Sequence, residues 1–204
     1  MGLLDTIHGI RSKRLELARL DPRGGMPSMP PPPASSSAIQ AVERRLGFAL
    51  PASYRAFLSA HDGWPGFFHG ANLLSTAALA RGTYMSVGRM AFAENTAELE
   101  DGPISVARAA TGFVPFGIDA QAEMVFGWDP TRVDDVSGEL RVIYWIHGVG
   151  DAVPSFTDFL DTVLEMLDAE LLDRRAQPVR TSAQPVPRDA RRLATPRPSA
   201  TRAA

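Results

Sequence analysis

The stretch EMVFGWDPTRVDDVSGELRVIYWI, residues 123–146, decides the fold class because two runs of alternating hydrophobic residues flank one polar segment. Apolar side chains recur at every second position in residues 124–128 and again in residues 140–146. This period of two is typical of strands with one buried face. Asp129 to Gly138 join the runs. The stretch therefore predicts an antiparallel hairpin with an acidic loop.

Further elements extend this hairpin in both directions along the chain. FVPFG (113–117) predicts a strand whose proline indicates an edge or a bulge, and residues 67–74 predict another short strand. Before them, helical spacing and stop signals predict helices that end at Gly47 and at Asp62, and a less regular helix over residues 84–99. After them, Ser155 and Asp158 predict the capped start of a closing helix. Helices, an antiparallel sheet and a closing helix predict an α+β domain.

The residues before the domain differ from it in composition. Residues 1–20 predict one amphipathic helix with a basic side, and this helix has three possible docking surfaces: its own domain, a partner protein or a membrane. We expect a protein surface. Residues 21–37 form a linker rich in proline and serine, in which the prolines of 30–33 favour an extended conformation. We expect this linker to hold the helix away from the domain; the alternative is a docking peptide for a proline-recognising partner.

Aromatic residues and charge mark the limits of the domain. All 16 aromatic residues lie between Phe48 and Phe159, so we place the packed domain at residues 38–173 and expect a disordered, Arg- and Pro-rich tail over residues 174–204. The formal charge of −2 conceals eight basic and 19 acidic residues between positions 35 and 173, a charge of −11. The tail holds eight Arg and one Asp, a charge of +7. It lacks aromatic residues, so we expect no specific nucleic-acid binding, and it is also free to fold back on the acidic domain.

Composition excludes several classes of chemistry. The chain has no Cys, which removes disulfides, thiol nucleophiles and Cys-ligated metal sites. Its four His residues show no spacing typical of metal ligands, and no apolar run is long enough for a membrane span. We therefore expect neither an enzyme nor a cofactor, and we expect a cytoplasmic protein. Arg outnumbers Lys by twenty to one, a bias that indicates a GC-rich, bacterial genome.

Carboxylates in the turns of the predicted sheet are the best candidates for a binding site. We expect five of them to share one edge of the sheet: Asp119, Glu123, Asp129, Asp134 and Asp135. Such a patch would steer a basic partner, and the alternative is a solvated charged rim. The spacing matches no calcium loop, so no metal is expected. Trp64, which follows a turn, is either a core residue or an exposed anchor for a partner.

Four ordered motifs resemble the SUKH superfamily, the Smi/Knr family named after fungal cell-wall assembly regulators. They are IQAVERRLGFALPASYRAFLSAHDGW (39–64), NLLSTAAL (72–79), FVPFGIDAQAEMVFGWDP (113–130) and SFTDFLDTVLEML (155–167). One departure concerns the turn after Gly117, where the family usually has glycines and this chain has IDAQAE. We assign the Leu-Gly-x-x-Leu-Pro and Tyr-x-x-Phe-Leu residues of the first motif, which include Gly47, Pro51 and Tyr54, to packing.

The resemblance implies a fold and a function. The implied fold is a mixed, mainly antiparallel sheet flanked by helices, used as a protein-binding scaffold. Bacterial members are typically immunity proteins, which bind and neutralise toxins, nucleases among them. We therefore expect a non-catalytic immunity protein whose partner is a cognate, basic toxin. The alternative is a regulatory adaptor that recruits a protein or a membrane surface through its N-terminal helix and linker. The sequence leaves the oligomeric state open.

Overall fold

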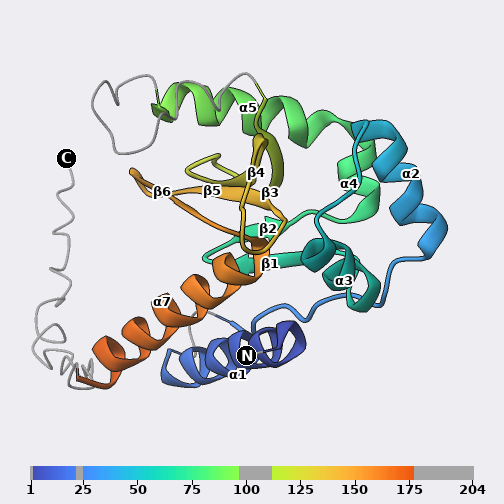
Figure 1. Ribbon diagram of the computed structural model, residues 1–204. Helices are drawn as coiled ribbons and strands as arrows, with labels where there is room; N and C mark the ends of the chain where they lie inside the picture. Colours follow the sequence, from blue (N-terminus) through green and yellow to red (C-terminus); the bar gives the residue numbers. More distant parts are fainter. Residues whose placement is uncertain (1, 22–24, 97–111, 177–204) are drawn as a thin grey trace, which may run out of the picture.

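The computed structural model describes residues 2–21, 25–96 and 112–176, which form a sheet with helices on both faces (Figure 1). The sheet consists of strands that follow the chain in the order β1-β2-β3-β4-β5-β6, and every neighbouring pair is antiparallel. Their bounds are β1 Trp64–Phe68, β2 Ala71–Leu73, β3 Val114–Ile118, β4 Met124–Val133, β5 Leu140–Ile146 and β6 Val149–Val153. The helices are α1 Leu3–Leu20, α2 Ser36–Leu46, α3 Ala52–Ala60, α4 Thr76–Arg81, α5 Thr83–Thr96 and α7 Phe156–Ala176. This architecture confirms the α+β class.

Three parts of the sheet differ from the prediction, and one of them is β6, Val149–Val153, which was not predicted. The single strand expected over residues 67–74 is a hairpin of β1 and β2, because His69 and Gly70 both adopt positive φ, 45° and 93°, and reverse the chain in two residues. β4 continues to Val133, into the segment expected to be loop. The β4–β5 hairpin is therefore longer than its hydrophobic pattern indicated. The expected helix over 84–99 corresponds to α5, and residues 97–99 lie outside the described part of the chain.

Aromatic rings fill the space between the sheet and α3 and α7. Phe116 of β3 is fully buried and lies 4.8 Å from Trp128, 5.4 Å from Tyr54 and 5.5 Å from Phe156, measured between ring centroids. The Tyr54 hydroxyl donates to the Leu74 carbonyl at 2.8 Å, and burial raises the pKa of this hydroxyl well above its usual range. These rings join α3, α7 and the middle of the sheet into one core.

On the other face of the sheet, α5 lies across β3 and β4 (Figure 1). Phe92 stacks on Phe113 with centroids 4.1 Å apart. Gly88 interrupts the helical pattern for a steric reason, because a Cβ atom there would lie 2.7 Å from the ring of Pro115. The glycine costs helix propensity but allows α5 to approach the sheet closely.

The family-like motif of residues 39–64 contributes to packing and to helix ends, as expected. Gly47 ends α2 in the left-handed conformation with φ 80°. The Glu43 carboxylate accepts a hydrogen bond from the Leu50 amide at 3.1 Å and so holds the connection to α3. Tyr54, Phe57 and Leu58 are fully buried. These residues therefore stabilise the scaffold.

The N-terminal helix α1 packs on its own domain, parallel to α7 (Figure 1). Contacts repeat at a constant offset of 155 residues: Thr6 donates to Asp161 at 2.9 Å, and Lys13 pairs with Asp168. Gly9 lies directly opposite Leu164 at the same offset. Arg174 and Arg175 pair with Asp21 and Glu16, respectively. Both arginines belong to α7, although the disordered tail was expected to begin at residue 174. Residues 177–204 lie outside the described part of the chain.

The linker lies along the domain, so the expectation that it holds α1 away from the domain is wrong. The Asp62 amide donates to the Pro32 carbonyl at 2.9 Å, and the Ala34 amide donates to the Leu58 carbonyl at 2.9 Å. Nearer to α1, the Trp64 indole donates to the Ser28 carbonyl at 3.2 Å. Proline carbonyls remain strong acceptors although proline has no amide hydrogen, and here they bind the α3–β1 connection.

Replacement of Ile10 by alanine tests the docking of α1. Ile10 is fully buried, so its loss should lower the free energy of unfolding by about 2–4 kcal/mol, measured by urea denaturation. Leu4 on the same helix is 61% exposed, and Leu4→Ala is the matched control, with an expected change within about 0.5 kcal/mol. Equal effects of the two substitutions would contradict the docking.

Candidate interaction site

The five carboxylates expected at one edge of the sheet do not lie together, because two pairs of them lie at opposite ends of β4. Asp119 and Glu123 belong to the β3–β4 turn, where Ile118 pairs with Val125. Asp134 and Asp135 belong to the β4–β5 connection, beyond the pairing of Val133 with Leu140. Because consecutive turns of an antiparallel meander lie at opposite ends of the shared strand, the length of β4 separates these two pairs. The fifth carboxylate, Asp129, lies within β4 and pairs with Arg141. The expectation of one shared acidic edge is therefore wrong.

Three of the predicted site residues are buried and stabilise the scaffold. Asp119 is 8% exposed, and its carboxylate accepts the Met124 amide at 2.9 Å. Asp129 is 4% exposed, and its carboxylate accepts the Thr131 amide at 2.9 Å. Trp64 is fully buried in the core, so it is not the exposed anchor that was one of its two expected roles. Glu123 remains exposed beside His147, at 3.7 Å.

Asp134 organises the segment that we call the β4–β5 loop, residues 133–139. Its carboxylate accepts hydrogen bonds from the amides of Ser137 at 2.7 Å and Val136 at 3.1 Å. These bonds favour the ionised form and hold the pKa of Asp134 below its usual value. The Asp134 backbone amide donates to the Glu139 carbonyl at 2.8 Å, and its carbonyl accepts the Gly138 amide at 2.9 Å. At neutral pH the loop is therefore closed on itself by its own acidic residue.

Glu139 fastens the other end of this loop to the N-terminus of α3. Its carboxylate accepts the Ser53 amide at 2.6 Å and also the Ser53 hydroxyl. Pro51, at the N-cap of α3, makes no side-chain capping bond, so Glu139 supplies the negative charge that a helix N-terminus favours. The carboxylates of Asp134 and Glu139 thus fix the β4–β5 loop through hydrogen bonds within the domain.

The side chains that this loop exposes are apolar and acidic. Val136 is 97% exposed and Val133 is 58% exposed, although both are β-branched apolar residues. Asp135, between them in sequence, is also exposed. Its carboxylate accepts no hydrogen bond from the described part of the chain. The sequence predicted only the acidic part of this site. Its signal for the apolar part was a pair of valines inside an otherwise polar turn, VDDVSG.

A groove of about 420 Å³ lies beside the loop. One wall is the connection between α2 and α3, residues 48–52, and the other is formed by Pro130 and residues 137–140. Its lining is mostly apolar, with Phe48, Leu50 and Leu140 among the contributing side chains. A protruding loop and an adjacent apolar groove together offer both a convex and a concave surface to a partner.

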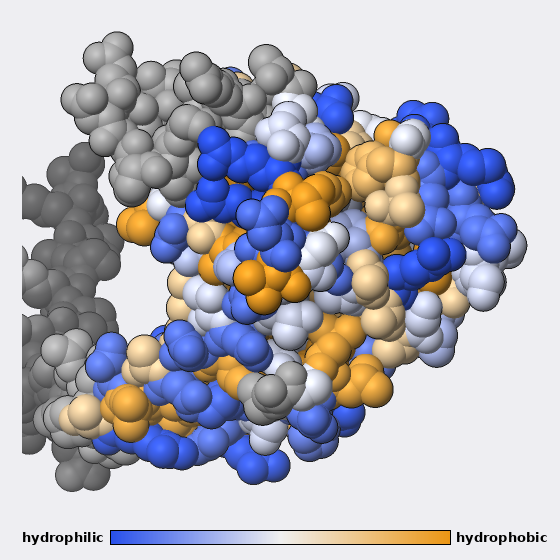
Figure 2. All heavy atoms as spheres, in the orientation of Figure 1, coloured by the Kyte–Doolittle hydropathy of each residue, from blue (hydrophilic) through white to orange (hydrophobic). Residues whose placement is uncertain are grey.

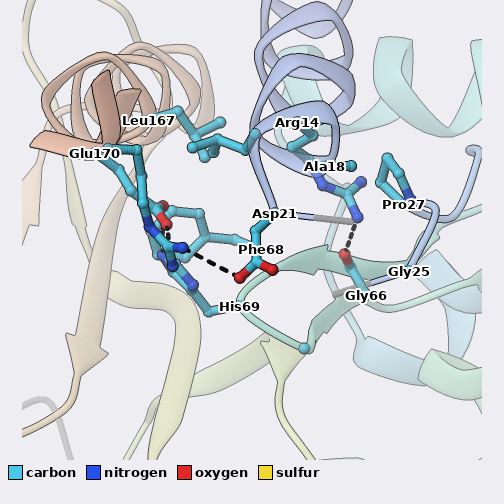
Figure 3. A pocket seen from close by; sticks show the side chains of 13 residues that line it. Arg14, Ala18, Asp21, Gly25, Pro27, Gly66, Phe68, His69, Leu167 and Glu170 are labelled. Carbon is cyan, nitrogen blue, oxygen red and sulfur yellow. Dashed lines mark hydrogen bonds and ion pairs between the residues drawn. The ribbon is translucent and has the colours of Figure 1, made fainter. Parts of the chain in front are cut away.

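A second hollow, of about 250 Å³, lies between α1, α7 and the β1–β2 hairpin (Figure 3). Its charged groups are used internally: Arg14 donates to the Gly66 carbonyl, and Arg174 pairs with Asp21 at 3.1 Å and with Glu170 at 3.8 Å. Arg14 also lies over the Trp64 ring, 5.3 Å from its centroid, and burial lowers the pKa of Arg14 to about 10. This network joins α1 to the domain, so we assign it to structure.

Surface chemistry elsewhere is dispersed. On the face seen in Figure 2, hydrophobic residues lie in separate groups among polar ones. Within residues 2–21, 25–96 and 112–176, no three His, Asp or Glu side chains come together as metal ligands. No helix in these ranges has the length and apolar character needed to cross a bilayer.

Comparison with known proteins gives one family. The model of the SMI1 / KNR4 family (SUKH-1) matches residues 33–162. The matched range contains the β4–β5 loop and both walls of the groove, but it excludes α1 and the C-terminal two thirds of α7. A search of curated proteins found no match.

Proposed function

Because this chain belongs to the SMI1/KNR4 family (SUKH-1), we propose that it is an immunity protein that neutralises a cognate toxin by binding it. The family fits a non-catalytic, partner-binding role of the immunity type. Fold alone does not identify a partner, so the proposal rests on one feature of this chain. That feature is the hydrogen-bonded β4–β5 loop, which exposes Val136, Val133 and Asp135.

Rigidity makes this loop suitable for binding. Asp134 closes the loop and Glu139 ties it to α3, so its conformation is set before a partner arrives. A preorganised loop loses little conformational entropy on association, and more of the contact energy then appears as affinity. Val136 is almost completely exposed, so its apolar side chain stays in contact with water unless a partner covers it. It is the residue that gains most from a complex.

Charge supports a basic partner. The 139 residues between positions 35 and 173 carry a charge of −11, and Asp135 adds its carboxylate at the exposed loop. Complementary charge accelerates association and raises the salt dependence of binding. We therefore propose a basic toxin domain, met in the cytoplasm of the producing cell.

The contacts of α1 favour this proposal over the adaptor alternative. Ile7 and Ile10 of α1 are buried in the domain, and the linker carbonyls bind the α3–β1 connection. An adaptor that recruits a second protein through α1 and the linker needs these groups free. In the described part of the chain they are already used.

Co-expression tests the proposal directly. A candidate toxin domain, sought among the genes that neighbour this one, is expressed with and without this chain in a sensitive host, and growth is followed. We expect the chain to restore growth and to co-purify with the toxin domain. The absence of both growth rescue and a complex would refute the immunity function.

A charge reversal tests the site within the same assay. Asp135→Lys should slow association with the toxin domain by about three- to tenfold and flatten its dependence on salt, as measured by stopped-flow or surface plasmon resonance. The matched control is Glu123→Lys at the opposite end of β4, which changes the net charge equally. If the control slows association as much as Asp135→Lys, charge acts through the whole domain and not through the loop.

A further inference from the structure

A hollow of about 360 Å³ beside the β4–β5 loop is lined by charges of both signs. It shares no residue with the groove along residues 48–52. Two arginines and two aspartates line it, so its formal charge is zero although the domain as a whole is acidic. The lining comes from the end of β4, the loop, the start of β5 and the chain at the end of β6, and consists of Arg132, Val133, Asp134, Asp135, Arg141, Ala152 and Pro154.

Two of these charges are already used within the domain. The Asp134 carboxylate accepts two amides of its own loop. The Arg132 Nε lies 4.0 Å from a carboxylate oxygen of Asp129. These contacts fix the loop and the end of β4. The charges that the hollow still offers to a ligand are those of Asp135 and Arg141.

Arg141 is a half-buried cation whose cross-strand carboxylate is bound elsewhere. Asp129 lies directly opposite Arg141 in the register of β4 and β5. One Asp129 oxygen accepts the Thr131 amide at 2.9 Å, and the other faces Arg132. Among the residues that the structure describes, none forms a hydrogen bond or an ion pair with the Arg141 guanidinium. Because this group stays charged at any pH that a protein tolerates, a carboxylate from outside is the group suited to pair with it.

Asp135 offers the opposite charge to the same hollow. It is exposed, and its carboxylate accepts no hydrogen bond from the described residues. Asp135 and Arg141 line one hollow but form no ion pair with each other. Two opposite charges held apart favour a partner that brings an anion to one and a cation to the other, and they repel a partner with the reverse order.

We infer that this hollow receives a carboxylate side chain of the partner, bound by Arg141, next to a basic residue that faces Asp135. The planar guanidinium binds a carboxylate through two parallel N–H bonds. Val133, Ala152 and Pro154 supply apolar surface around this contact, which lowers the amount of water near the ion pair and strengthens it. The inference rests on the proposed function and deepens it, because a toxin surface that is basic overall then carries an acidic residue at this position.

A pair of small peptides tests the hollow without any knowledge of the partner. N-acetyl-Lys-Glu-N-methylamide carries both charges, and N-acetyl-Lys-Gln-N-methylamide lacks the carboxylate. Each is titrated to about 50 mM, at constant ionic strength, into the ¹⁵N-labelled full chain. The Arg141 Nε–H cross-peak is assigned as the one missing from the spectrum of Arg141→Gln. The acidic domain as a whole favours the more positive Gln peptide, so general attraction alone predicts the opposite preference.

We expect the Lys-Glu peptide to shift the Arg141 cross-peak saturably, with a dissociation constant at least threefold lower than that of the Lys-Gln peptide. Equal dissociation constants, or a cross-peak that neither peptide moves, would overturn the inference.

A charge exchange in the complex with the toxin domain provides the second test. Asp135→Arg combined with Arg141→Asp keeps the net charge and reverses the order of the two charges. We expect this chain to bind the toxin domain about thirtyfold more weakly, measured by isothermal titration calorimetry. Arg141→Gln alone should weaken binding about tenfold. The matched control is Arg11→Gln at an exposed position of α1, with an expected change within twofold.

The outcomes separate this inference from the proposed function. Affinity of the exchanged chain within twofold of the unaltered chain would refute the carboxylate contact and leave the immunity function standing. Equal losses for Arg141→Gln and Arg11→Gln would refute it as well. Failure of the unaltered chain to bind or neutralise a toxin domain would refute the immunity function, while the peptide titration still decides the hollow.

Discussion

Replacement of Phe116 by alanine should lower the free energy of unfolding by about 3–5 kcal/mol, the largest stability effect that we expect from one substitution. Phe116 is fully buried at the centre of the aromatic core. Its ring contacts Tyr54 of α3, Trp128 of β4 and Phe159 of α7, the last at 5.7 Å between centroids. Truncation removes the apolar surface of the ring and leaves a cavity that three rigid elements cannot close.

Urea or thermal unfolding of the purified full chain measures this effect. The control is Val149→Ala at a position that is 69% exposed, with an expected change within about 0.5 kcal/mol. Phe116→Leu keeps most of the volume and should recover part of the loss, which provides a measurable variant if the alanine protein does not fold. A loss below about 1 kcal/mol for Phe116→Ala would contradict the proposed centre of the core.

Val136→Asp should weaken binding to the toxin domain about a hundredfold, which corresponds to about 2.7 kcal/mol. The substitution places a charge where the complex would bury an apolar side chain, and a buried unpaired charge is costly. Val136 is 97% exposed, so the stability of the free chain should not change. Isothermal titration calorimetry with the toxin domain measures the affinity, and urea denaturation checks the fold.

Val149→Asp is the matched control for this binding experiment. Val149 is an exposed valine of β6 that pairs with Ile146 beside the His147-Gly148 turn, and Met124 of β4 pairs with the same Ile146. It therefore lies at the end of the sheet opposite to the β4–β5 loop. We expect toxin affinity to stay within about twofold of the unaltered chain. Equal losses for Val136→Asp and Val149→Asp would show that the added charge, and not its place, weakens binding.

Local signals in the sequence were sufficient for most elements of the fold. Ser155 and Asp158 predicted the start of α7, where the Asp158 amide donates to the Ser155 hydroxyl and this hydroxyl donates to the Asp158 carboxylate. The alternation in residues 124–128 and 140–146 predicted β4 and β5 because it follows directly from which side chains are buried. Gly47 likewise predicted the end of α2 from its conformational freedom.

Long-range geometry was not available from these signals. The docking of α1 depends on pairs 155 residues apart, such as Thr6 with Asp161, and no local pattern specifies such a pair. The five carboxylates were grouped because each lies near a turn, but the order of strands places alternate turns at opposite ends. Asp119 and Asp129 are charged residues, a type usually found at the surface, yet they are buried and accept hydrogen bonds from backbone amides.

Of the candidate site, the sequence predicted Asp134 and Asp135 but not that their roles differ. Asp134 closes the loop, and Asp135 remains exposed. Val136 was missed because apolar residues are expected inside, and only the hydrogen bonds of Asp134 show why this valine is held outside.

Amide hydrogen exchange of the complex with the toxin domain is the most direct test of the claim that the β4–β5 loop is the binding site. The full chain is compared free and bound, with exchange followed for each amide. We predict slower exchange across residues 133–139 in the complex, and unchanged exchange across residues 147–151 at the other end of the sheet. Protection confined to residues 119–123 and 147–151, or to α1 and α7, with residues 133–139 exchanging as in the free chain, would contradict the account.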